Sequence, residues 1–510
     1  MKVDKGAHGM MPAQVDTLIL GGGTAGCALA GLIAERSSDS ILLLEAGPDY
    51  GPLRDGRWPR ELLDARRLPV SHDWGYDSGP FLPGRRVAYE RARVIAGCSA
   101  HNGCSAVWGT QWDYDGWADS GNPGWSAGEV LPLLQTVDRR LKVRRYANSE
   151  IPPYQRAVFE AACAAGFPAS ADMNDLAEDE AVAYCPVNNQ RGIRWNTAFA
   201  YLDAARGRRG LTTQGGALIV RLLIERGRVA GAEAIVDGVT TIVRARRTIL
   251  AAGAYGSPAI LLRSGIGDPK ALEPLGIRVE HALPGVGRNL QDHPAVAVAF
   301  PGSPALEEMS AVFERGNWTP EELVIVKARS RLATESFDIH LFSEGGRVAD
   351  GSDAWRWQIY AAGLLPRSRG EVRLASLDPA AAPLIDHRHL SDAEDGDLAV
   401  LADGVEIIKR IAAQPPLGSL LGAPIADPVR GDRRGLEAWI RSQVVHYWHP
   451  VGTCAMGSDP DEGAVVDARG RLHGLADGYV ADASIMPRIP RANTNIPTVL
   501  VAERIASWLT

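Results

Sequence analysis

The sequence predicts an α/β protein in which a Rossmann-like domain is joined to a second, α+β domain built on an antiparallel sheet. Three observations support this fold class. A strand, a glycine-rich turn and a helix follow one another near the start, a group of short strands occupies residues 218–252, and about the last seventy residues return to glycine-rich turns. Because 510 residues are too many for one simple hydrophobic core, two domains are expected.

The first strand–helix–strand unit is marked by its apolar periodicity. Residues 15–20 form an apolar run typical of a buried strand, residues 24–36 have helical apolar spacing, and residues 41–44 form a second apolar strand that ends at Glu45. Strands joined by a crossover helix pair in parallel, so this unit predicts the centre of a parallel sheet.

The next elements are a helical, loop-rich stretch at 110–205 and a series of strands. Residues 50–90 are rich in Gly, Pro and Arg and look irregular. The strands are predicted at residues 218–223, 232–236, 241–244 and 248–252. Ser257 and Pro258 predict a helix start, with Ser as N-cap and Pro at the first helical position.

The domains are expected to interleave. We assign residues 13–294 and 441–510 to the first domain, with insertions from the second within about 50–90 and 110–205. Residues 295–440, where strands and helices alternate with few glycine turns, form most of the second domain.

Composition excludes several functional classes. Hydrophobic content is 45%, charged content 23% and the net charge −7, with no long basic run for nucleic acid or an anionic membrane. The six cysteines match neither a zinc site nor a C-x-x-C motif, which favours a reduced, cytoplasmic protein. Residues 1–12 lack the apolar region of a secretory signal, and no apolar run reaches eighteen residues, so no membrane span is expected.

A dinucleotide-binding fingerprint follows the first strand. Gly21, Gly23 and Gly26 satisfy G-x-G-x-x-G, with Thr24 and Ala25 between them at the helix start. The turn and the helix N-terminus suit a pyrophosphate, and Glu45, about twenty residues further on, suits a ribose hydroxyl. The motif does not separate NAD from FAD. Residues 284–287 lack the full pattern, so a reductase with two nucleotide sites is disfavoured.

The chain resembles the glucose–methanol–choline (GMC) oxidoreductases over nearly its whole length. The matching segments are residues 15–47, 93–108, 252–258, 285–293, 368–370, 449–454, 482–487 and 495–498. The resemblance implies that the discontinuous first domain binds FAD, that residues 295–440 bind substrate, and that an alcohol is oxidised to an aldehyde or ketone. The positions that match the family's cofactor-binding motifs are Gly21, Gly23, Thr24, Ala25, Gly26, Glu45, Ala46, Arg93, Ala96, Gly97, His101, Asn102, Gly103, Ser105, Val220, Ala252, Gly253, Trp448, Asp482, Ala483, Asn495, Ile496 and Pro497.

His101 departs from the pattern of many family members, which have an apolar residue there. Choline oxidase-like members have a histidine bonded to the flavin 8α-methyl group at this position. The surrounding segment, residues 97–104, is similar in this chain, so the resemblance implies an FAD covalently linked through His101.

His449 and Asn495 match the family's catalytic positions. The resemblance implies that His449 accepts the hydroxyl proton while hydride passes to flavin N5, and imidazole titrates in a range that suits this task. Asn495 cannot act as a base, but its amide donates a hydrogen bond to the substrate oxygen. Strand alternation places Val445, Tyr447 and His449 on one face, so His446 is interpreted as structural.

The substrate is expected between the flavin and residues 295–440. Candidate contacts are Phe337, His340, Phe342, Trp357 and Tyr447. An aromatic or other weakly polar primary alcohol is predicted because no carboxylate is seen to converge on the site; Glu344 is a carboxylate that the sequence cannot place.

Oxygen or another acceptor reoxidises the flavin. Tyr447 is larger than the residue of choline oxidase-like members, which favours a dehydrogenase. No metal is expected, because His387-Arg388-His389 looks like an alternating surface segment and Asp459 to Glu462 like a solvated loop.

Two other functional classes stay open from the sequence. One is a lyase or photoenzyme on the same fold, and the other is a flavin-binding protein without catalysis. The pair His449 and Asn495 argues against both. The oligomeric state is not predicted.

Overall fold

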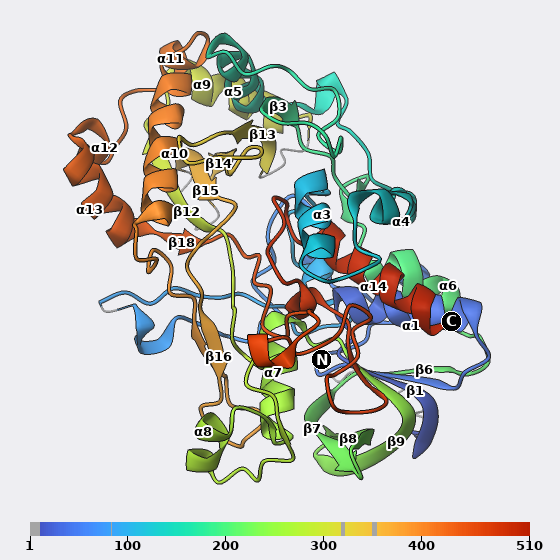
Figure 1. Cartoon of the computed structure of the whole chain (residues 1–510). Helices are drawn as coiled ribbons and strands as arrows, with labels where there is room; N and C mark the ends of the chain where they lie inside the picture. Colours follow the sequence, from blue (N-terminus) through green and yellow to red (C-terminus); the bar gives the residue numbers. More distant parts are fainter. Residues whose placement is uncertain (1–10, 83, 318–321, 349–353) are drawn as a thin grey trace.

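The computed structural model describes residues 11–82, 84–317, 322–348 and 354–510. Two large sheets organise the chain (Figure 1). One, in the lower part of the view, carries the fingerprint, and the other, in the upper part, is antiparallel and has helices on its outer side. The predicted fold class is therefore confirmed.

The first sheet has seven strands and combines a parallel and an antiparallel part. β1 (Gln14–Leu20) lies between β2 (Ile41–Leu44) and β9 (Val239–Leu250), parallel to both, and β6 (Leu211–Gln214) extends the parallel part beyond β2. β8 (Arg228–Val236) and β7 (Ala217–Glu225) follow β9 in antiparallel pairs. The predicted strands at 241–244 and 248–252 are one continuous strand, β9.

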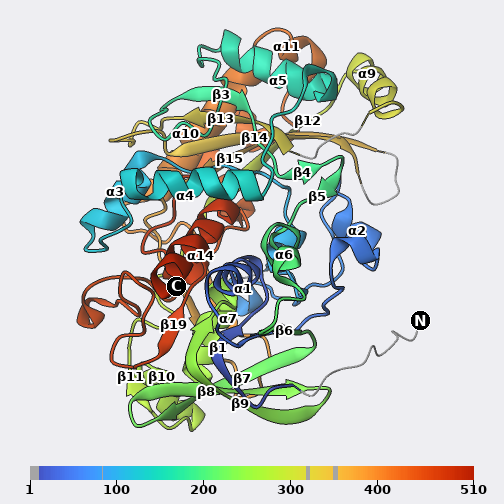
Figure 2. The same cartoon turned by 90° about the vertical axis from the view of Figure 1, so that its right-hand side faces the viewer.

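The C-terminal segment returns to this sheet. β19 (Gly478–Val480) pairs in parallel with β9, with Val480 opposite Leu250. Helices α1 (Thr24–Arg36) and α14 (Asn495–Leu509) then pack against each other on one face of the sheet (Figures 1 and 2). Both helices are apolar on most sides because they are buried in the core of this part.

The second sheet has six antiparallel strands. Their order is β18 (Val445–His446), β12 (Pro294–Phe300), β15 (Trp355–Gly363), β14 (Ile339–Arg347), β13 (Glu322–Ala328) and β3 (Ala181–Tyr184). Apolar side chains of one face pack against α5 (Pro153–Ala164), α10 (Gly396–Ala412) and α13 (Arg433–Gln443). The opposite face carries a separate cluster that includes Phe342 and Tyr447.

The remaining elements connect these sheets or cover their ends. The helices are α2 (Arg60–Leu63), α3 (Gln111–Asp119), α4 (Ala127–Arg140), α6 (Asp203–Ala205), α7 (Gly253–Arg263), α8 (Pro269–Leu272), α9 (Pro304–Glu314), α11 (Leu417–Leu420) and α12 (Asp427–Arg430). The short strands are β4 (Asn189–Gln190), β5 (Ile193–Arg194), β10 (Ile266–Gly267), β11 (His281–Ala282), β16 (Glu371–Arg373) and β17 (Leu384–Asp386).

The start predicted for α7 is wrong. The helix begins at Gly253, and Pro258 lies inside it. The missing N–H of Pro258 leaves the Ala254 carbonyl without its helical donor, and the Thr453 hydroxyl donates to that carbonyl at 2.6 Å instead. The Ser257 hydroxyl donates to Asp482, far along the chain, rather than capping the helix.

No helix within the described ranges combines the length and apolarity that a membrane crossing needs.

Candidate active site

A cavity of about 630 Å³ is lined by the fingerprint and by one face of the antiparallel sheet. Its walls come from the turn after β1, the end of β2, the segment around residue 100, the start of α7 and the segments that precede and open α14. The predicted site residues that line it are Gly21, Gly23, Thr24, Ala25, Glu45, Ala46, Gly97, His101, Asn102, Gly103, Ser105, Ala252, Gly253, Trp448, His449, Asp482, Ala483 and Asn495.

The fingerprint wall is built by close backbone contacts. A Cβ at Gly26 would lie 1.8 Å from the Gly21 carbonyl oxygen, so only glycine permits this turn. Gly97 has a φ of +52°, and a Cβ there would lie 2.7 Å from the Gly23 Cα. The two glycine-rich segments therefore touch, and the N-terminus of α1 opens into the cavity with its N–H donors unblocked by bulky side chains.

Glu45 ends β2 with its carboxylate fixed toward this wall. Its two oxygens accept hydrogen bonds from the backbone N–H groups of Gly22 and Gly47, each at 2.8 Å. Burial raises the pKa of Glu45 to about 7, against the effect of these bonds. The arrangement suits a sugar hydroxyl, which either donates to or accepts from such a carboxyl group.

Six predicted cofactor positions do not line the cavity. Gly26, Ile496 and Pro497 lie within the first turns of α1 and α14, and Ala96 lies behind Gly97. The Arg93 guanidinium covers the Trp74 ring, 4.7 Å from its centroid, and the Val220 carbonyl accepts from Arg263.

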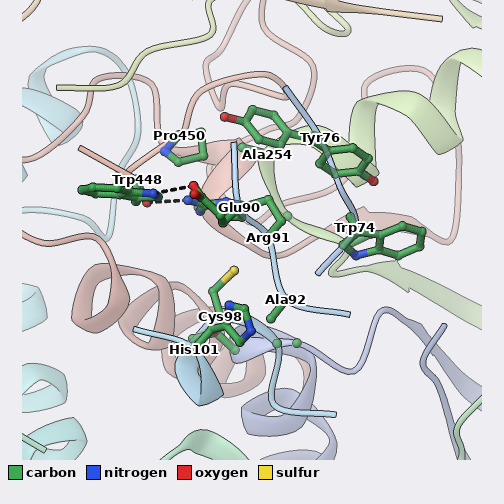
Figure 3. A pocket seen from close by; sticks show the side chains of 18 of the residues that line it. Trp74, Tyr76, Glu90, Arg91, Ala92, Cys98, His101, Ala254, Trp448 and Pro450 are labelled. Atoms are coloured by element: carbon green, nitrogen blue, oxygen red, sulfur yellow. Dashed lines mark hydrogen bonds between the residues drawn. The ribbon is translucent and has the colours of Figure 1, made fainter. Parts of the chain in front are cut away.

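His101 follows the short helical turn Gly97–Ala100. Its Nε2 lies 2.6 Å from the Ser71 carbonyl oxygen, and burial lowers the pKa of the imidazole. In Figure 3, His101 and Cys98 lie on one side of the cavity, opposite Glu90 and Arg91.

Several lining residues were not predicted from the sequence. Trp74, Tyr76, Glu90, Arg91 and Cys98 line the cavity. Arg91 donates to the Trp448 carbonyl at 3.0 Å, and the Trp448 indole N–H donates to Glu90 at 2.8 Å (Figure 3). Four of the five lie in the segment 50–91, which has no periodic pattern. The density of aromatic and charged residues around 73–91 is the one signal that marks this segment.

His449 lies at the far end of the cavity, beyond β18. Its backbone N–H donates to Asp292 at 2.9 Å, and its Nδ1 lies 3.0 Å from Nδ1 of His293. Burial, reinforced by the positive charge of a protonated His293, holds the pKa of His449 well below its usual range. The imidazole is therefore neutral at physiological pH.

His446 points away from this end. Its Nε2 lies 2.8 Å from the Ala88 carbonyl, and its Nδ1 accepts from the Trp448 backbone. Tyr447 and His449 both line the cavity, with ring centroids 4.4 Å apart, and Trp448 between them lines it as well, because β18 ends at His446 and the strict alternation ends with it.

Asn495 is the first residue of α14 and lines the same cavity. Both polar atoms of its amide are shielded from solvent and find no hydrogen-bond partner within the part of the chain that the structure describes. Such an orphaned amide is costly unless a ligand completes it, so it points to a polar atom of a bound group.

A buried ion pair holds the loop that leads to Asn495. Arg491 Nη1 lies 2.7 Å from Asp113 Oδ1, and the Arg491 backbone N–H donates to the same carboxylate. Both side chains are almost completely buried. Asp113 is held in turn by Thr110, at the start of α3.

The substrate-contact candidates divide into two groups. Phe342, Tyr447 and Glu344 line the cavity. Trp357 packs on the opposite face of the sheet, 5.0 Å from Tyr154, and the stacked rings of Phe337 and His340 lie outside the lining. The premise that no carboxylate converges on the site is wrong, because β14 carries Glu344 into its wall.

The surface-like assignment of residues 387–389 is also wrong. His387 is 4% exposed, bonds to the Tyr255 hydroxyl at 2.7 Å and stacks on His389 at 5.0 Å. The segment follows β17; Tyr89 and Tyr255 pack against His387, whereas Arg388 is exposed. Among the described residues, no group of three His, Cys, Asp or Glu side chains is arranged to hold a metal ion.

Comparisons with known proteins support one family. Residues 15–295 match the N-terminal family model described as GMC oxidoreductase, and residues 366–502 match the C-terminal one. The chain is 32% identical to an oxygen-dependent choline dehydrogenase of Pseudomonas savastanoi pv. phaseolicola, over 97% of this chain and 93% of that protein. A similar enzyme of Klebsiella pneumoniae is also 32% identical, over 97% and 95%.

Solved structures agree. Pyridoxine 4-oxidase from Mesorbium loti has a TM-score of 0.86 at 27% identity and covers 97% of this chain and 98% of its own. A fungal aryl-alcohol oxidase has the same fold, with a TM-score of 0.80 at 21% identity, and covers 98% and 100%. These relatives do not favour the lyase or photoenzyme alternative. The chain therefore belongs to the GMC oxidoreductase family and is an FAD-dependent enzyme that oxidises alcohols.

Proposed function

We propose that a small alcohol is oxidised in the part of the cavity that His449 and Asn495 line. The observation that carries this proposal is the pair itself: a neutral buried imidazole and an amide with two unpartnered polar atoms line one cavity with the fingerprint. His449 acts as the base for the hydroxyl proton, and Asn495 donates a hydrogen bond to the oxygen as negative charge develops there.

The contact with His293 determines which nitrogen of His449 acts as the base. Since His449 Nδ1 faces His293 Nδ1, Nε2 is the nitrogen left for the substrate. A base at Nε2 requires the proton to sit on Nδ1, which then donates to His293. His293 thus holds His449 in the reactive tautomer and gives the imidazolium a partner after proton transfer.

The walls of the cavity fit FAD. The unblocked N-terminus of α1 suits the pyrophosphate, Glu45 suits the ribose, and the orphaned Asn495 amide suits a polar ring edge or the substrate oxygen. FAD, when bound, supplies the hydride acceptor, N5 of the ring. We also propose that residues 13–294 and 441–510 form the FAD-binding domain and residues 295–440 the substrate-binding domain.

We propose further that His101 is bonded to the flavin 8α-methyl group. The bond replaces one methyl C–H and the imidazole N–H, and the two electrons left on the ring go to the enzyme's acceptor. Attachment through Nε2 requires loss of the contact with Ser71, whereas attachment through Nδ1 leaves it in place. Acid precipitation tests the bond: the yellow colour should stay in the pellet, and His101→Ala should release it.

The electron acceptor is proposed from the position of Tyr447. Its ring lies against Phe342 and His449 and narrows the space beside the reacting end, which favours an acceptor other than oxygen. Rapid peroxide formation at full turnover in air would contradict this proposal.

An anaerobic panel of alcohols tests the activity. A substrate should bleach the flavin absorbance without any other addition, and the colour should return with oxygen or a quinone. A flavoprotein that no alcohol bleaches would overturn the proposed function.

A further inference from the structure

The cavity-facing side of β14 has a repeated pattern. His340, Phe342 and Glu344 alternate with Leu341 and Ser343, which face the opposite core or the buried Gln155. In the register with β15, Phe342 lies opposite Tyr360 and Glu344 opposite Gln358. Phe342 and Glu344 therefore form a continuous strip of wall that leads away from the catalytic end.

Glu344 is held in this wall by two neighbours. Gln358 Nε2 donates to its carboxylate at 2.6 Å and also lies 2.7 Å from the Tyr360 hydroxyl, which bonds to the same carboxylate. Burial raises the pKa of Glu344, while these bonds and the exposed Arg356 act in the opposite direction.

Between Glu344 and His449 the wall is aromatic. The rings of Tyr360, Phe342 and Tyr447 are stacked nearly parallel, each 4.4 Å from the next. The Tyr447 ring lies 4.4 Å from His449, and Glu344 follows Phe342 by two strand residues, about 7 Å. Phe342 and Tyr447 therefore place an aromatic stretch of cavity wall between Glu344 and His449.

We propose, resting on the function proposed above, that Glu344 is a specificity-determining residue and that the substrate is an aromatic alcohol with a cationic N–H group remote from its carbinol. The ring lies along the aromatic wall, the carbinol reaches His449 and Asn495, and the N–H group donates to the Glu344 carboxylate. This replaces the weakly polar alcohol predicted from the sequence.

The recognition follows from charge and geometry. A charge-assisted hydrogen bond in a site withdrawn from water is stronger than a neutral one. An anionic substituent at the same place would be repelled and would lose its hydration. A quaternary ammonium would meet the negative charge but has no hydrogen for the carboxylate to accept.

A charge series on one skeleton tests the proposal. The probes are 4-(aminomethyl)benzyl alcohol, benzyl alcohol and 4-(hydroxymethyl)benzoate, with choline as the quaternary probe. In the wild type, kcat/KM should be at least about 10-fold higher for the cation than for benzyl alcohol, and lowest for the anion. Choline should be a poorer substrate than the aminomethyl compound.

Glu344→Gln keeps the size and the hydrogen-bonding capacity of the side chain and removes its charge. This variant should lose about 10- to 100-fold in kcat/KM for the cationic alcohol, mainly through KM, and less than about 3-fold for benzyl alcohol. Glu225→Gln, at an exposed ion pair on the first sheet, is the matched control and should change neither value. Equal losses for both alcohols, or no cation preference in the wild type, would overturn the proposal.

Binding to the wild-type holoenzyme separates this proposal from the proposed function and needs no variant. Benzylamine should perturb the flavin spectrum at lower concentration than toluene or benzoate. If benzylamine binds selectively but no alcohol bleaches the flavin, the subsite stands and the proposed oxidation fails. If benzyl alcohol bleaches the flavin and benzylamine binds no better than toluene, the subsite fails alone.

Discussion

The two ends of the cavity differ in what lines them: mainly backbone groups at one end and mainly side chains at the other. At the fingerprint end, glycine backbones and the N-terminus of α1 form much of the wall, and the contacts at Gly26 and Gly97 leave no room for a Cβ. At the catalytic end, imidazole, amide, carboxylate and aromatic side chains from β14, the segment after β18 and the start of α14 form it. The first end therefore determines whether the cofactor binds, and the second determines which chemistry follows and on which substrate.

The largest expected effect separates these two tasks. His449→Gln removes the base but leaves the fingerprint end intact, so the anaerobic rate of flavin reduction by an alcohol should fall by about 10²- to 10⁴-fold. The flavin content should stay at its wild-type value. His446→Gln, one strand position from Tyr447 on the opposite face, should lower the rate at least ten times less. Similar losses in both variants would contradict the assignment of His449.

The next effect concerns the support of the catalytic end. Asp113→Asn removes the buried counter-ion of Arg491 and leaves it only the half-exposed Glu335 carboxylate at 3.4 Å, so the free energy of unfolding should fall by up to about 3–5 kcal/mol. Denaturant titration measures this change in the free energy of unfolding. The exposed pair of Glu225 and Arg244 provides the control, because water screens it, and Glu225→Gln should leave the midpoint unchanged. If Asp113→Asn had the same denaturation midpoint as the wild type, the loop before Asn495 would be held by other contacts.

At the fingerprint end, the addition of a single methyl group should weaken flavin binding. Gly97→Ala places a Cβ 2.7 Å from Gly23 Cα at a positive φ, which costs about 1–2 kcal/mol from the backbone conformation alone. The ratio of flavin to protein absorbance after purification should fall. Gly128→Ala in α4 is the control, because a Cβ added there would meet no atom within 4 Å, the φ of Gly128 is not positive and the residue does not line the cavity. Equal flavin content in the two variants would refute the close contact.

The sequence predicts the fingerprint end of the cavity better than it predicts the contacts between distant side chains. The sequence predicts the strand, turn and helix around Gly21 and Gly26 because only glycine permits that backbone. The glycine motif therefore specifies the geometry of the turn. The start of α7 was mispredicted because Ser257 has its partner in Asp482, which local capping rules do not include. Glu344 and His387 were misjudged for a similar reason: an alternating strand pattern gives two faces but does not say what covers each one.

The smallest effect is a pH dependence that belongs to the catalytic end alone. Burial lowers the pKa of His293 to about 3, and burial together with repulsion from a protonated His293 holds the pKa of His449 well below its usual range. The base acts as the neutral form, and a lowered pKa keeps it neutral as the pH falls. With benzyl alcohol, which has no ionisable substituent, kcat/KM should therefore stay level through pH 6.5 and decline only below it.

His293→Asn tests the cause of this shift. Asparagine accepts the hydrogen bond from His449 but carries no charge, so one source of repulsion disappears and the acid limb should move up toward pH 6.5. The movement should be modest, because burial is the larger cause and is unchanged. A wild-type acid limb at or above pH 6.5 would mean that bound FAD and substrate stabilise the imidazolium, and that the buried histidines do not set the pKa of the base.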